Sequence, residues 1–219
     1  MKKAMTKLKP KPTFDVELEF AKRYGGQIAG VDEAGRGPLA GPVVAAAVAF
    51  DEADIRTGLV GELANLNDSK TLRADKREQL YSEIKNKFQV GIGVADRVRI
   101  DTDNILNATL WAMQVAIYKL QPVPAGVLID GNKAPKLDCK TRTIIGGDGR
   151  CLSIAAASIV AKVTRDTMMC ELAETYPQYG FERHKGYGTK AHLEAMRRHG
   201  VCDAHRRSFR PVRVVLGLE

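Results

Sequence analysis

Three short apolar segments of this chain each lead into an aspartate, and this pattern constrains both the fold and the chemistry. The aspartates are Asp32, Asp130 and Asp148. Aspartate is depleted in β-strands, and burying an unpaired carboxylate is costly. Each acid alone could cap a turn or a helix, as aspartate often does. Because sites in open α/β sheets form beyond the strand ends, the recurrence favours three acids that converge on one site.

The apolar periodicity predicts an α/β fold, a mixed central sheet of about five strands flanked by helices. The predicted strands cover residues 27–32, 43–50, 89–95, 126–129 and 143–145. The first two are joined by a short turn-rich loop and should form a hairpin. The predicted helices are one that follows residues 67–71, one that begins within 101–103, an alanine-rich one over 153–169, and a last one over 190–199. The helix over 153–169 is apolar almost all round, so we expect it to be buried against the sheet.

The length of 219 residues allows one domain that buries its core without covalent staples. We expect a basic, disordered tail over residues 1–20 and a single domain over 21–219 that includes a basic C-terminal helical segment. The four cysteines are scattered without metal-ligand spacing, which is typical of reduced thiols in a cytoplasmic protein. No stretch approaches the roughly 20 apolar residues of a membrane span, so no membrane partner is expected.

The formal net charge of +8 favours polyanionic partners, because neutralised phosphates release counterions. All four histidines lie at or after His184, and we expect them at the surface. Basic residues lie among them: Arg183, Lys185, Arg197, Arg198, Arg206, Arg207 and Arg210. We interpret this region as a nucleic-acid surface; a merely solvated basic face is the alternative.

Carboxylates that converge repel one another and raise each other's pKa unless cations lie between them. Hard oxygen ligands of this kind suit Mg²⁺ or Mn²⁺. Glu33 follows Asp32 directly, and neighbouring strand residues point to opposite faces. For both to reach one site, we expect the strand geometry to break at Ala34-Gly35.

The segment Gly35-Arg36-Gly37 resembles part of a dinucleotide-binding fingerprint, which requires a helix that opens at the glycines. Here Pro38 and Pro42 lead into a β-branched apolar run instead, so that interpretation fails. We expect the glycines to bring backbone amides close to a sugar or phosphate, with Arg36 as a charged clamp.

The segment over residues 30–43, GVDEAGRGPLAGPV, closely resembles the signature of bacterial ribonuclease HII. Further segments that resemble the family lie at residues 67–70, 129–132, 155–166, 184–187 and 206–209. The resemblance covers nearly everything from about residue 27 to the end. The related ribonuclease HIII family has a long N-terminal substrate-binding domain and usually lacks the arginine of the glycine motif. Arg36 and the short tail favour ribonuclease HII.

The resemblance implies a ribonuclease H-like fold for the catalytic domain, cleavage of RNA in RNA–DNA hybrids, and incision at single ribonucleotides in duplex DNA. Such an enzyme would serve DNA repair, and we expect it to act as a monomer. In the family, the acids that match Asp32, Glu33, Asp130 and Asp148 hold the metals. The family's glycine motif, here residues 35–37, reads the ribose 2′-hydroxyl. The tyrosine that matches Tyr187 packs on the neighbouring deoxyribose.

Two-metal catalysis agrees with this reading. One ion generates the attacking hydroxide for cleavage 5′ of the ribonucleotide, and the other stabilises the leaving 3′ oxygen, which leaves 3′-hydroxyl and 5′-phosphate ends. Two lysines are further candidates for substrate binding. Lys70 contacts phosphate or is simply solvated, and both readings stay open. Lys162 lies on the buried helix, so it should approach the acids or pair with Asp166, a structural partner rather than a metal ligand.

Two other functions stay open at this stage. A non-catalytic nucleic-acid-binding protein would show hybrid affinity that ignores divalent metal, and the four acids argue against it. A different two-metal nuclease, such as a junction resolvase, would cleave without regard to the 2′-hydroxyl.

Overall fold

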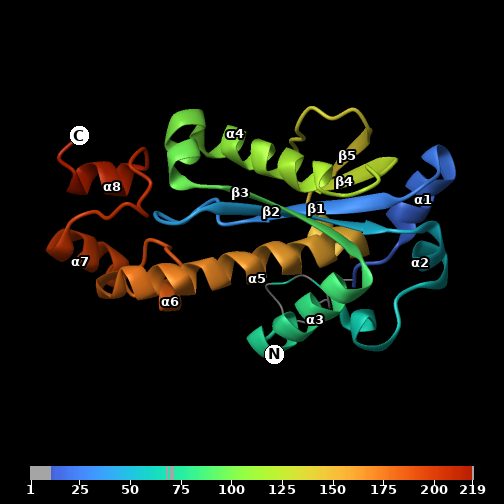
Figure 1. Cartoon of the computed structure of the whole chain (residues 1–219), viewed down its shortest axis with the longest axis horizontal. Coiled ribbons are helices and arrows are strands. Elements are labelled where there is room, and N and C mark those ends of the chain that lie inside the picture. The colour runs from blue at the N-terminus through green and yellow to red at the C-terminus, as the bar shows by residue number, and fades with distance from the viewer. Residues whose placement is uncertain (1–10, 68, 70–71, 219) are drawn as a thin grey trace, which may run out of the picture.

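The computed structural model describes residues 11–67, 69 and 72–218. Its core is one sheet in the order β3-β2-β1-β4-β5 (Figure 1). The strands of the described chain are β1 (Ile28–Ala34), β2 (Val43–Phe50), β3 (Gln89–Ala95), β4 (Gly126–Asp130) and β5 (Lys140–Ile144). Strands β1, β2 and β3 pair antiparallel, whereas β4 and β5 are parallel to β1. The predicted mixed sheet of five strands is confirmed, as is the hairpin of β1 and β2.

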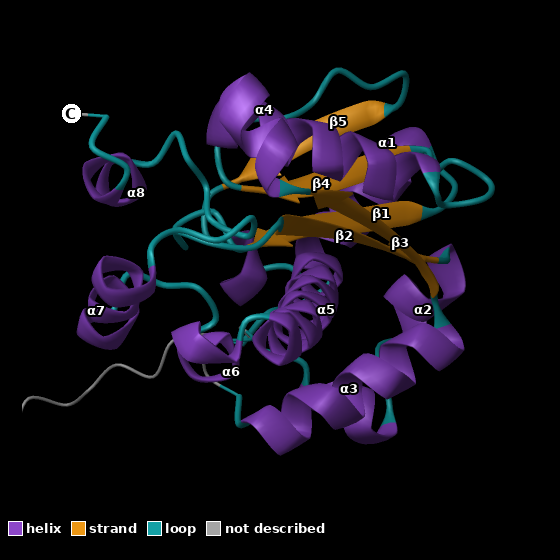
Figure 2. Ribbon diagram, turned by 60° about the vertical axis from the view of Figure 1, so that its left-hand side comes forward, coloured by secondary structure: helices purple, strands orange, loops and turns teal. Residues whose placement is uncertain are grey.

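Two long helices cover the sheet, one on each face (Figures 1 and 2). Helix α4 (Arg97–Tyr118) packs on β3 and β2, and helix α5 (Leu152–Thr175) packs on β1 and β2, with α3 (Ala74–Lys87) alongside α5. Helices α1 (Asp15–Tyr24) and α2 (Glu52–Thr57) lie at one end of the sheet; α6 (Phe181–His184), α7 (Lys190–His199) and α8 (Arg210–Val215) lie at the other. Short 3₁₀ turns lie at η1 (Gly61–Asn65), η2 (Gly147–Gly149) and η3 (Pro177–Tyr179). Among the described residues, no helix is long and apolar enough to cross a membrane.

Strand β2 is buried along its whole length, which explains why its sequence is apolar without alternation. Ala46, Val48 and Phe50 face the cluster under α5. The intervening residues, Ala45 and Ala47 among them, face the cluster under α4. A strand between two helical layers therefore needs apolar side chains on both faces.

Helix α5 approaches β1 so closely that only glycine fits between them. A Cβ atom at Gly30 would lie 2.0 Å from the backbone carbon of Ser153. On the other face, Cβ atoms at Gly91 and Gly93 would lie 1.9 Å from backbone oxygens of α4. The alanine-rich sequence of α5 serves the same close packing, because small side chains let a helix backbone approach a sheet.

The expected disordered tail over residues 1–20 is wrong for its second half. Residues 1–10 lie outside the described residues, but α1 begins at Asp15. Phe14 and Phe20 are buried in the core under α5. Glu17 is also buried, and its Oε1 accepts a hydrogen bond from the Ser153 backbone N–H at 2.9 Å. Burial raises the pKa of Glu17. Helix α1 is thus ordered by aromatic burial and by capping the start of α5.

The long helix α4 begins earlier than the predicted caps at residues 101–103. Its N-cap is Asp96, whose carboxylate accepts from the Arg99 backbone N–H. Asn104 then interrupts the helix at φ 64°, and its Oδ1 accepts from the backbone N–H groups of Leu106 and Asn107. Asn104 therefore ends one helical segment and caps the next, as asparagine in the left-handed region often does.

Three other boundaries differ from the sequence prediction. Helix α3 begins at Ala74, later than the segment 67–71 suggested. Strand β5 begins at Lys140 and is largely exposed. Its residues are mostly polar, so the apolar pattern of the sequence does not indicate where it begins. Helix α5 continues to Thr175, beyond the predicted end at 169. The last predicted helix, α7 over residues 190–199, is confirmed with Thr189 as its N-cap.

The contact of α5 with β1 predicts a strong effect of one methyl group. Gly30→Ala should lower the free energy of unfolding by about 2 kcal/mol or more, because the methyl meets backbone that cannot move aside. Urea unfolding followed by circular dichroism measures the change. Gly149→Ala is the matched control, since a Cβ there meets nothing within 4 Å. Equal stability of both variants would contradict the packing described.

Candidate active site

A cavity of about 350 Å³ opens beside the end of β1. Its lining combines acidic, basic, glycine and aromatic residues from β1, the loop after it, α5 and the segment after α6. The lining residues are Asp32, Glu33, Ala34, Gly35, Arg36, Gly37, Ser69, Ser158, Lys162, Arg165 and Tyr187. Residues far apart in the sequence therefore meet at one opening.

The sheet pairing explains why the cavity lies there. Strand β1 pairs with β4 only as far as Val31 opposite Ile129, whereas it stays paired with β2 through Ala34. Asp32 and Asp130 lie just beyond the last pair of β1 and β4. Both follow, at a spacing of two, residues whose positions face α5, so both carboxylates share that face of the sheet.

Glu33 lines the cavity, and the strand geometry breaks where the sequence predicted, at Ala34-Gly35. Strand β1 remains paired through Ala34, and the turn comes at Gly35, whose φ is +95°. Because β1 has no ladder partner on its β4 side beyond Val31, the Glu33 side chain can reach around that open edge. Its Oε1 accepts a hydrogen bond from Arg36 Nη1 at 3.2 Å. The open strand edge and the turn at Gly35 together allow the two adjacent acids to line one cavity.

Asp32 is the most strongly perturbed acid of the site. It is 5% exposed, and its Oδ1 accepts from the Glu33 backbone N–H at 2.7 Å. Burial raises the pKa of Asp32 well above its ordinary value, and repulsion from Glu33 and Asp130 raises it further; the Ser158 hydroxyl and the Glu33 N–H act in the opposite direction. Burial also raises the pKa of Glu33, while its ion pair with Arg36 opposes that rise. These three carboxyl groups interact electrostatically as one group.

Asp148 is tied to this group through the backbone. It is 7% exposed and lies in the η2 turn, directly after Gly147. The Gly147 N–H donates to Asp130 Oδ1 at 2.7 Å, so Asp130 holds the turn that carries Asp148. Gly146, whose φ is +65°, begins this tight turn.

The chemistry of this group fits a divalent cation. Within residues 11–67, 69 and 72–218, no three His, Cys, Asp or Glu side chains are arranged so that they could hold a metal ion as they stand. Metal binding by the four acids together therefore stays a prediction. In its favour, buried carboxylates that raise one another's pKa are the hard oxygen donors whose repulsion a divalent cation relieves.

The glycine segment and Tyr187 lie side by side. A Cβ at Gly37 would lie 3.6 Å from Cε1 of Tyr187, so the ring rests against the glycine. The ring is 48% exposed and lines the same cavity as Arg36. An exposed aromatic face beside exposed backbone is suited to a flat or sugar-like group.

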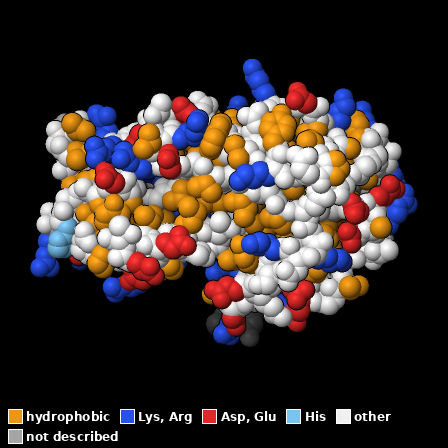
Figure 3. Space-filling view, viewed as in Figure 1, with side chains coloured by type: hydrophobic (Ala, Val, Ile, Leu, Met, Phe, Trp, Pro, Cys, Tyr) orange, Lys and Arg blue, Asp and Glu red, His pale blue; other side chains and the backbone are white. Residues whose placement is uncertain are grey.

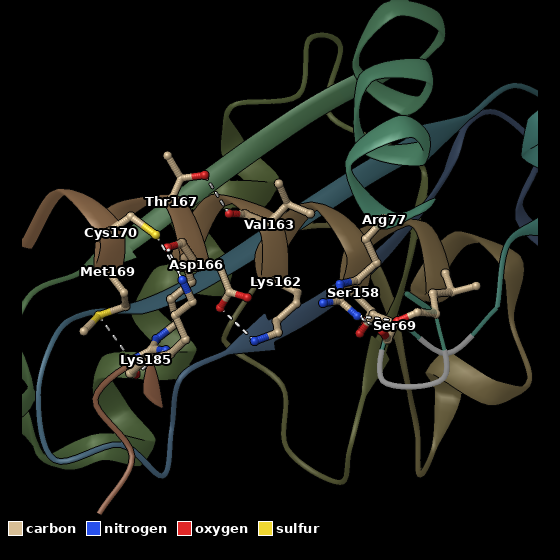
Figure 4. A network of polar contacts seen from close by, with 12 residues as sticks. Ser69, Arg77, Ser158, Lys162, Val163, Asp166, Thr167, Met169, Cys170 and Lys185 are labelled. Atoms are coloured by element: carbon tan, nitrogen blue, oxygen red, sulfur yellow. Dashed lines mark hydrogen bonds and ion pairs between the residues drawn. The ribbon is translucent and has the colours of Figure 1, made fainter. Parts of the chain in front are cut away.

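Lys162 pairs with Asp166, as predicted. Its Nζ donates to Asp166 Oδ1 at 2.7 Å, and the side chain also lines the cavity (Figure 4). The ion pair offsets the cost of placing an ammonium group on a largely buried helix. Lys70, the other candidate lysine, lies outside the described residues.

Sequence reasoning missed three residues of this region. The Ser158 hydroxyl lies 2.9 Å from the Ser69 hydroxyl (Figure 4) and is bonded to Asp32, so it links a loop to the most buried acid of the site. Arg165 and Arg206 are fully buried beneath the glycine segment. A polar stripe on α5 could have revealed the first two, because residues 158, 162 and 165 share one face of a helix that is otherwise apolar.

The expectation of surface histidines is wrong for two of the four. His192 and His205 are fully buried, and their Nε2 atoms lie 3.1 Å apart. His192 Nδ1 lies 2.9 Å from the Tyr187 backbone oxygen, and its ring stacks on His184. Burial lowers the pKa of His205 to about 4, and repulsion from His192 adds to this shift. These histidines thus support the segment that carries Tyr187. Because His192 and His205 are buried, they are not part of a nucleic-acid surface.

The predicted basic surface also needs correction at one position. Arg206 is buried and belongs to the interior of this end of the molecule. On the face seen in Figure 3, Lys and Arg side chains are interspersed with Asp and Glu rather than gathered in one patch. Contact between the remaining basic side chains and nucleic acid stays a prediction.

The raised pKa of Asp32 predicts a stability effect of known sign. When the pKa of an acid is higher in the folded state than in the unfolded state, the free energy of unfolding falls as pH rises from the unfolded pKa through the folded pKa. With a chelator present, Asp32→Asn should therefore be more stable than the parent at neutral pH, and its advantage should grow with pH across this range. Urea unfolding at several pH values measures it. A parent whose stability does not fall relative to Asp32→Asn would contradict the burial and repulsion described.

The comparisons with known protein sequences all point to one family. The family model for ribonuclease HII matches residues 29–212. A ribonuclease HII of Xanthobacter autotrophicus is 54% identical over 85% of this chain and 72% of its own length. One of Parvibaculum lavamentivorans is 50% identical over 100% of this chain and 80% of its own length.

Solved structures show the same fold. The ribonuclease H2 of Pyrococcus horikoshii matches with a TM-score of 0.73 and 25% identity, covering 86% of this chain and 96% of that one. A Bst ribonuclease HIII in complex with Mn²⁺ matches with a TM-score of 0.68 and 17% identity, covering 88% of this chain and 70% of that one.

Proposed function

The chain belongs to the ribonuclease HII family and is a nuclease that hydrolyses RNA in RNA–DNA hybrids, and we propose that its cavity also directs nicking 5′ of single ribonucleotides in duplex DNA. The observation that carries this proposal is the lining of the cavity. One opening joins Asp32 and Glu33 to the glycine segment over residues 35–37 and to Tyr187. The reacting groups and the groups suited to recognise a sugar are thus contiguous. Such an activity would remove ribonucleotides from DNA.

The acids would hold divalent metal, Mn²⁺ or Mg²⁺. Asp32, Glu33 and Asp130 supply the crowded carboxylates, and Asp148 lies on the turn that Asp130 holds. Two such ions, when bound, supply activation of the attacking water and charge stabilisation of the leaving 3′ oxygen, which leaves 3′-hydroxyl and 5′-phosphate ends. A ribonuclease HIII of the same fold was solved with Mn²⁺, which agrees with this assignment.

The protein's own groups orient these acids. Ser158 and the Glu33 N–H both bond to Asp32 and so limit its rotation. Arg36 is paired with Glu33 at the mouth of the cavity, from where its guanidinium can exchange that partner for a substrate phosphate. Lys162 places a second cation in the lining for the same purpose. Opposite charges therefore flank the position where a phosphodiester would be cut.

Recognition of the ribose would fall to the glycine segment. With no Cβ at Gly35 or Gly37, the backbone can approach a sugar closely, and the 2′-hydroxyl is the group that separates RNA from DNA. Tyr187 rests against Gly37, so its ring would meet the neighbouring sugar. An RNA-to-DNA junction would then be read by two adjacent contacts.

A nicking assay tests the proposal. Duplex DNA with one ribonucleotide, incubated with Mn²⁺ or Mg²⁺, should be cut on the 5′ side of that ribonucleotide, and the same duplex without it should stay intact. Cleavage of both would indicate a nuclease that ignores the 2′-hydroxyl, such as a junction resolvase. Absence of cleavage with both metals, together with hybrid binding that ignores metal, would indicate a non-catalytic binding protein.

Removing one acid should stop the reaction without unfolding the protein. Asp130→Asn should reduce kcat by at least ~100-fold, because a lost charge at a metal site costs several kcal/mol of transition-state stabilisation. Gel-based turnover with Mn²⁺ measures it. Asp138→Asn is the matched control, since this exposed acid bonds to Tyr118 far from the cavity. Undiminished turnover of Asp130→Asn would remove Asp130 from the mechanism.

Tyr187 should act mainly on substrate binding. Tyr187→Ala should raise KM roughly 5- to 150-fold, because an aromatic contact with nucleic acid contributes about 1–3 kcal/mol. Tyr187→Phe keeps the ring and should change KM little. The kinetics of nicking at a single ribonucleotide provide the measurement, and equal KM values for the parent and both variants would argue against a ring-to-sugar contact.

A further inference from the structure

Two buried arginines lie beneath the glycine segment. Arg206 is 0% exposed and Arg165 is 1% exposed. In the part of the chain that the structure describes, neither guanidinium forms an ion pair with a carboxylate. A buried cation without a paired acid is costly, so its hydrogen bonds must offset much of that cost.

Within the described residues, the oxygen acceptors of Arg206 are all backbone carbonyls of the loop that follows β1. Its Nε donates to Gly41 O at 3.0 Å, and its Nη1 donates to Arg36 O at 2.9 Å. Its Nη2 donates to Gly35 O at 2.6 Å and to Pro42 O at 3.1 Å. One planar side chain thus fixes both ends of this loop.

Arg165 joins the same loop to the segment that carries Tyr187. Its Nε donates to Pro42 O at 2.9 Å, the oxygen that also accepts from Arg206. Its other two nitrogens donate to Ala40 O and Lys185 O. A Cβ at Gly35 would lie 1.9 Å from Arg165 Nε, so this position also needs glycine to admit the guanidinium.

The directions of the loop carbonyls also fix the directions of the backbone N–H groups next to them. In a trans peptide, the C=O of one residue and the N–H of the next point in opposite directions. The carbonyls of Gly35 and Arg36 point to Arg206, so the N–H groups of Arg36 and Gly37 point away from it. Residues 35–37 line the cavity, whereas Arg206 does not. Two backbone donors therefore lie on the side of the loop opposite Arg206.

We propose that Arg206, supported by Arg165, is a positioning residue that fixes the Arg36 and Gly37 amides toward the substrate and so sets the preference for a ribonucleotide over a deoxyribonucleotide. The inference rests on the proposed function of the glycine segment. A guanidinium behind the carbonyls also polarises these peptides, which makes their N–H groups stronger donors. Lysine at this position would keep the charge but lose the planar fork that spans several carbonyls.

The affinity of a variant that binds its substrate without cutting it tests this inference. Arg206→Lys is introduced together with Asp130→Asn, and fluorescence anisotropy measures binding to a duplex with one ribonucleotide and to the same duplex entirely of DNA. The ratio of the two affinities should fall about tenfold, equivalent to about 1.4 kcal/mol, while affinity for plain DNA stays unchanged. Arg56→Lys is the matched control, because its exposed guanidinium pairs with Glu52 on the remote helix α2.

The outcomes separate the inference from the function on which it rests. An unchanged ratio, or equal losses on both duplexes, would overturn the positioning role. If the Asp130→Asn protein itself shows no preference for the ribonucleotide, the proposed recognition falls, and the positioning role falls with it.

Amide hydrogen exchange of the parent chain gives a second test that does not depend on the variant's folding. The amides of Arg36 and Gly37 should exchange faster than that of Leu39, which donates to Gly186 O. They should slow when the duplex with one ribonucleotide binds. Slow exchange in the free protein, or no protection by this duplex, would overturn the proposal.

Discussion

The close contact between α5 and β1 is the interaction on which the site depends. Gly30 lets the start of α5 lie directly on the strand, and the helix then runs beneath the strand end. From that position Ser158 reaches Asp32, Lys162 enters the cavity and Arg165 grips the loop beyond the strand. A side chain at residue 30 would displace all three groups together. Packing in the core therefore determines geometry at the surface.

Beside this contact, like charges lie close together in a buried place. Asp32 is buried beside Glu33 and Asp130, and its pKa is raised by burial and by both neighbours. Two buried guanidiniums lie a short distance away, with backbone carbonyls in place of acids as partners. A protein selected for stability alone would separate or neutralise such groups. The crowding of Asp32 and Glu33 at one cavity is understandable if metal ions complete the charge balance there.

Much of the fold was predictable because it depends on local pattern. Strands β2 and β3 and helix α7 begin and end where apolar periodicity and the Thr189 cap place them. The acids at the ends of β1 and β4 were also predictable, since charged residues at the ends of apolar strands are unusual. These features need no knowledge of distant contacts.

The rest depends on contacts that no local pattern records. Helix α1 is ordered by burial of Phe14 and Phe20 against distant residues. The path of Glu33 into the cavity follows from where pairing of β1 and β4 stops. Arg206 looked like part of a basic surface, because the sequence does not reveal which arginine faces inward. Its carbonyl partners lie more than 160 positions away in the chain.

The crowded carboxylates would form a divalent-metal site, and direct binding of Mn²⁺ tests this proposal. Electron paramagnetic resonance of free Mn²⁺ counts the ions that the full chain removes from solution. We expect the parent to bind Mn²⁺, an RNA–DNA hybrid to strengthen this binding, and Asp32→Asn to weaken it clearly. Binding of equal strength in the variant, or no binding by the parent even with hybrid present, would contradict it.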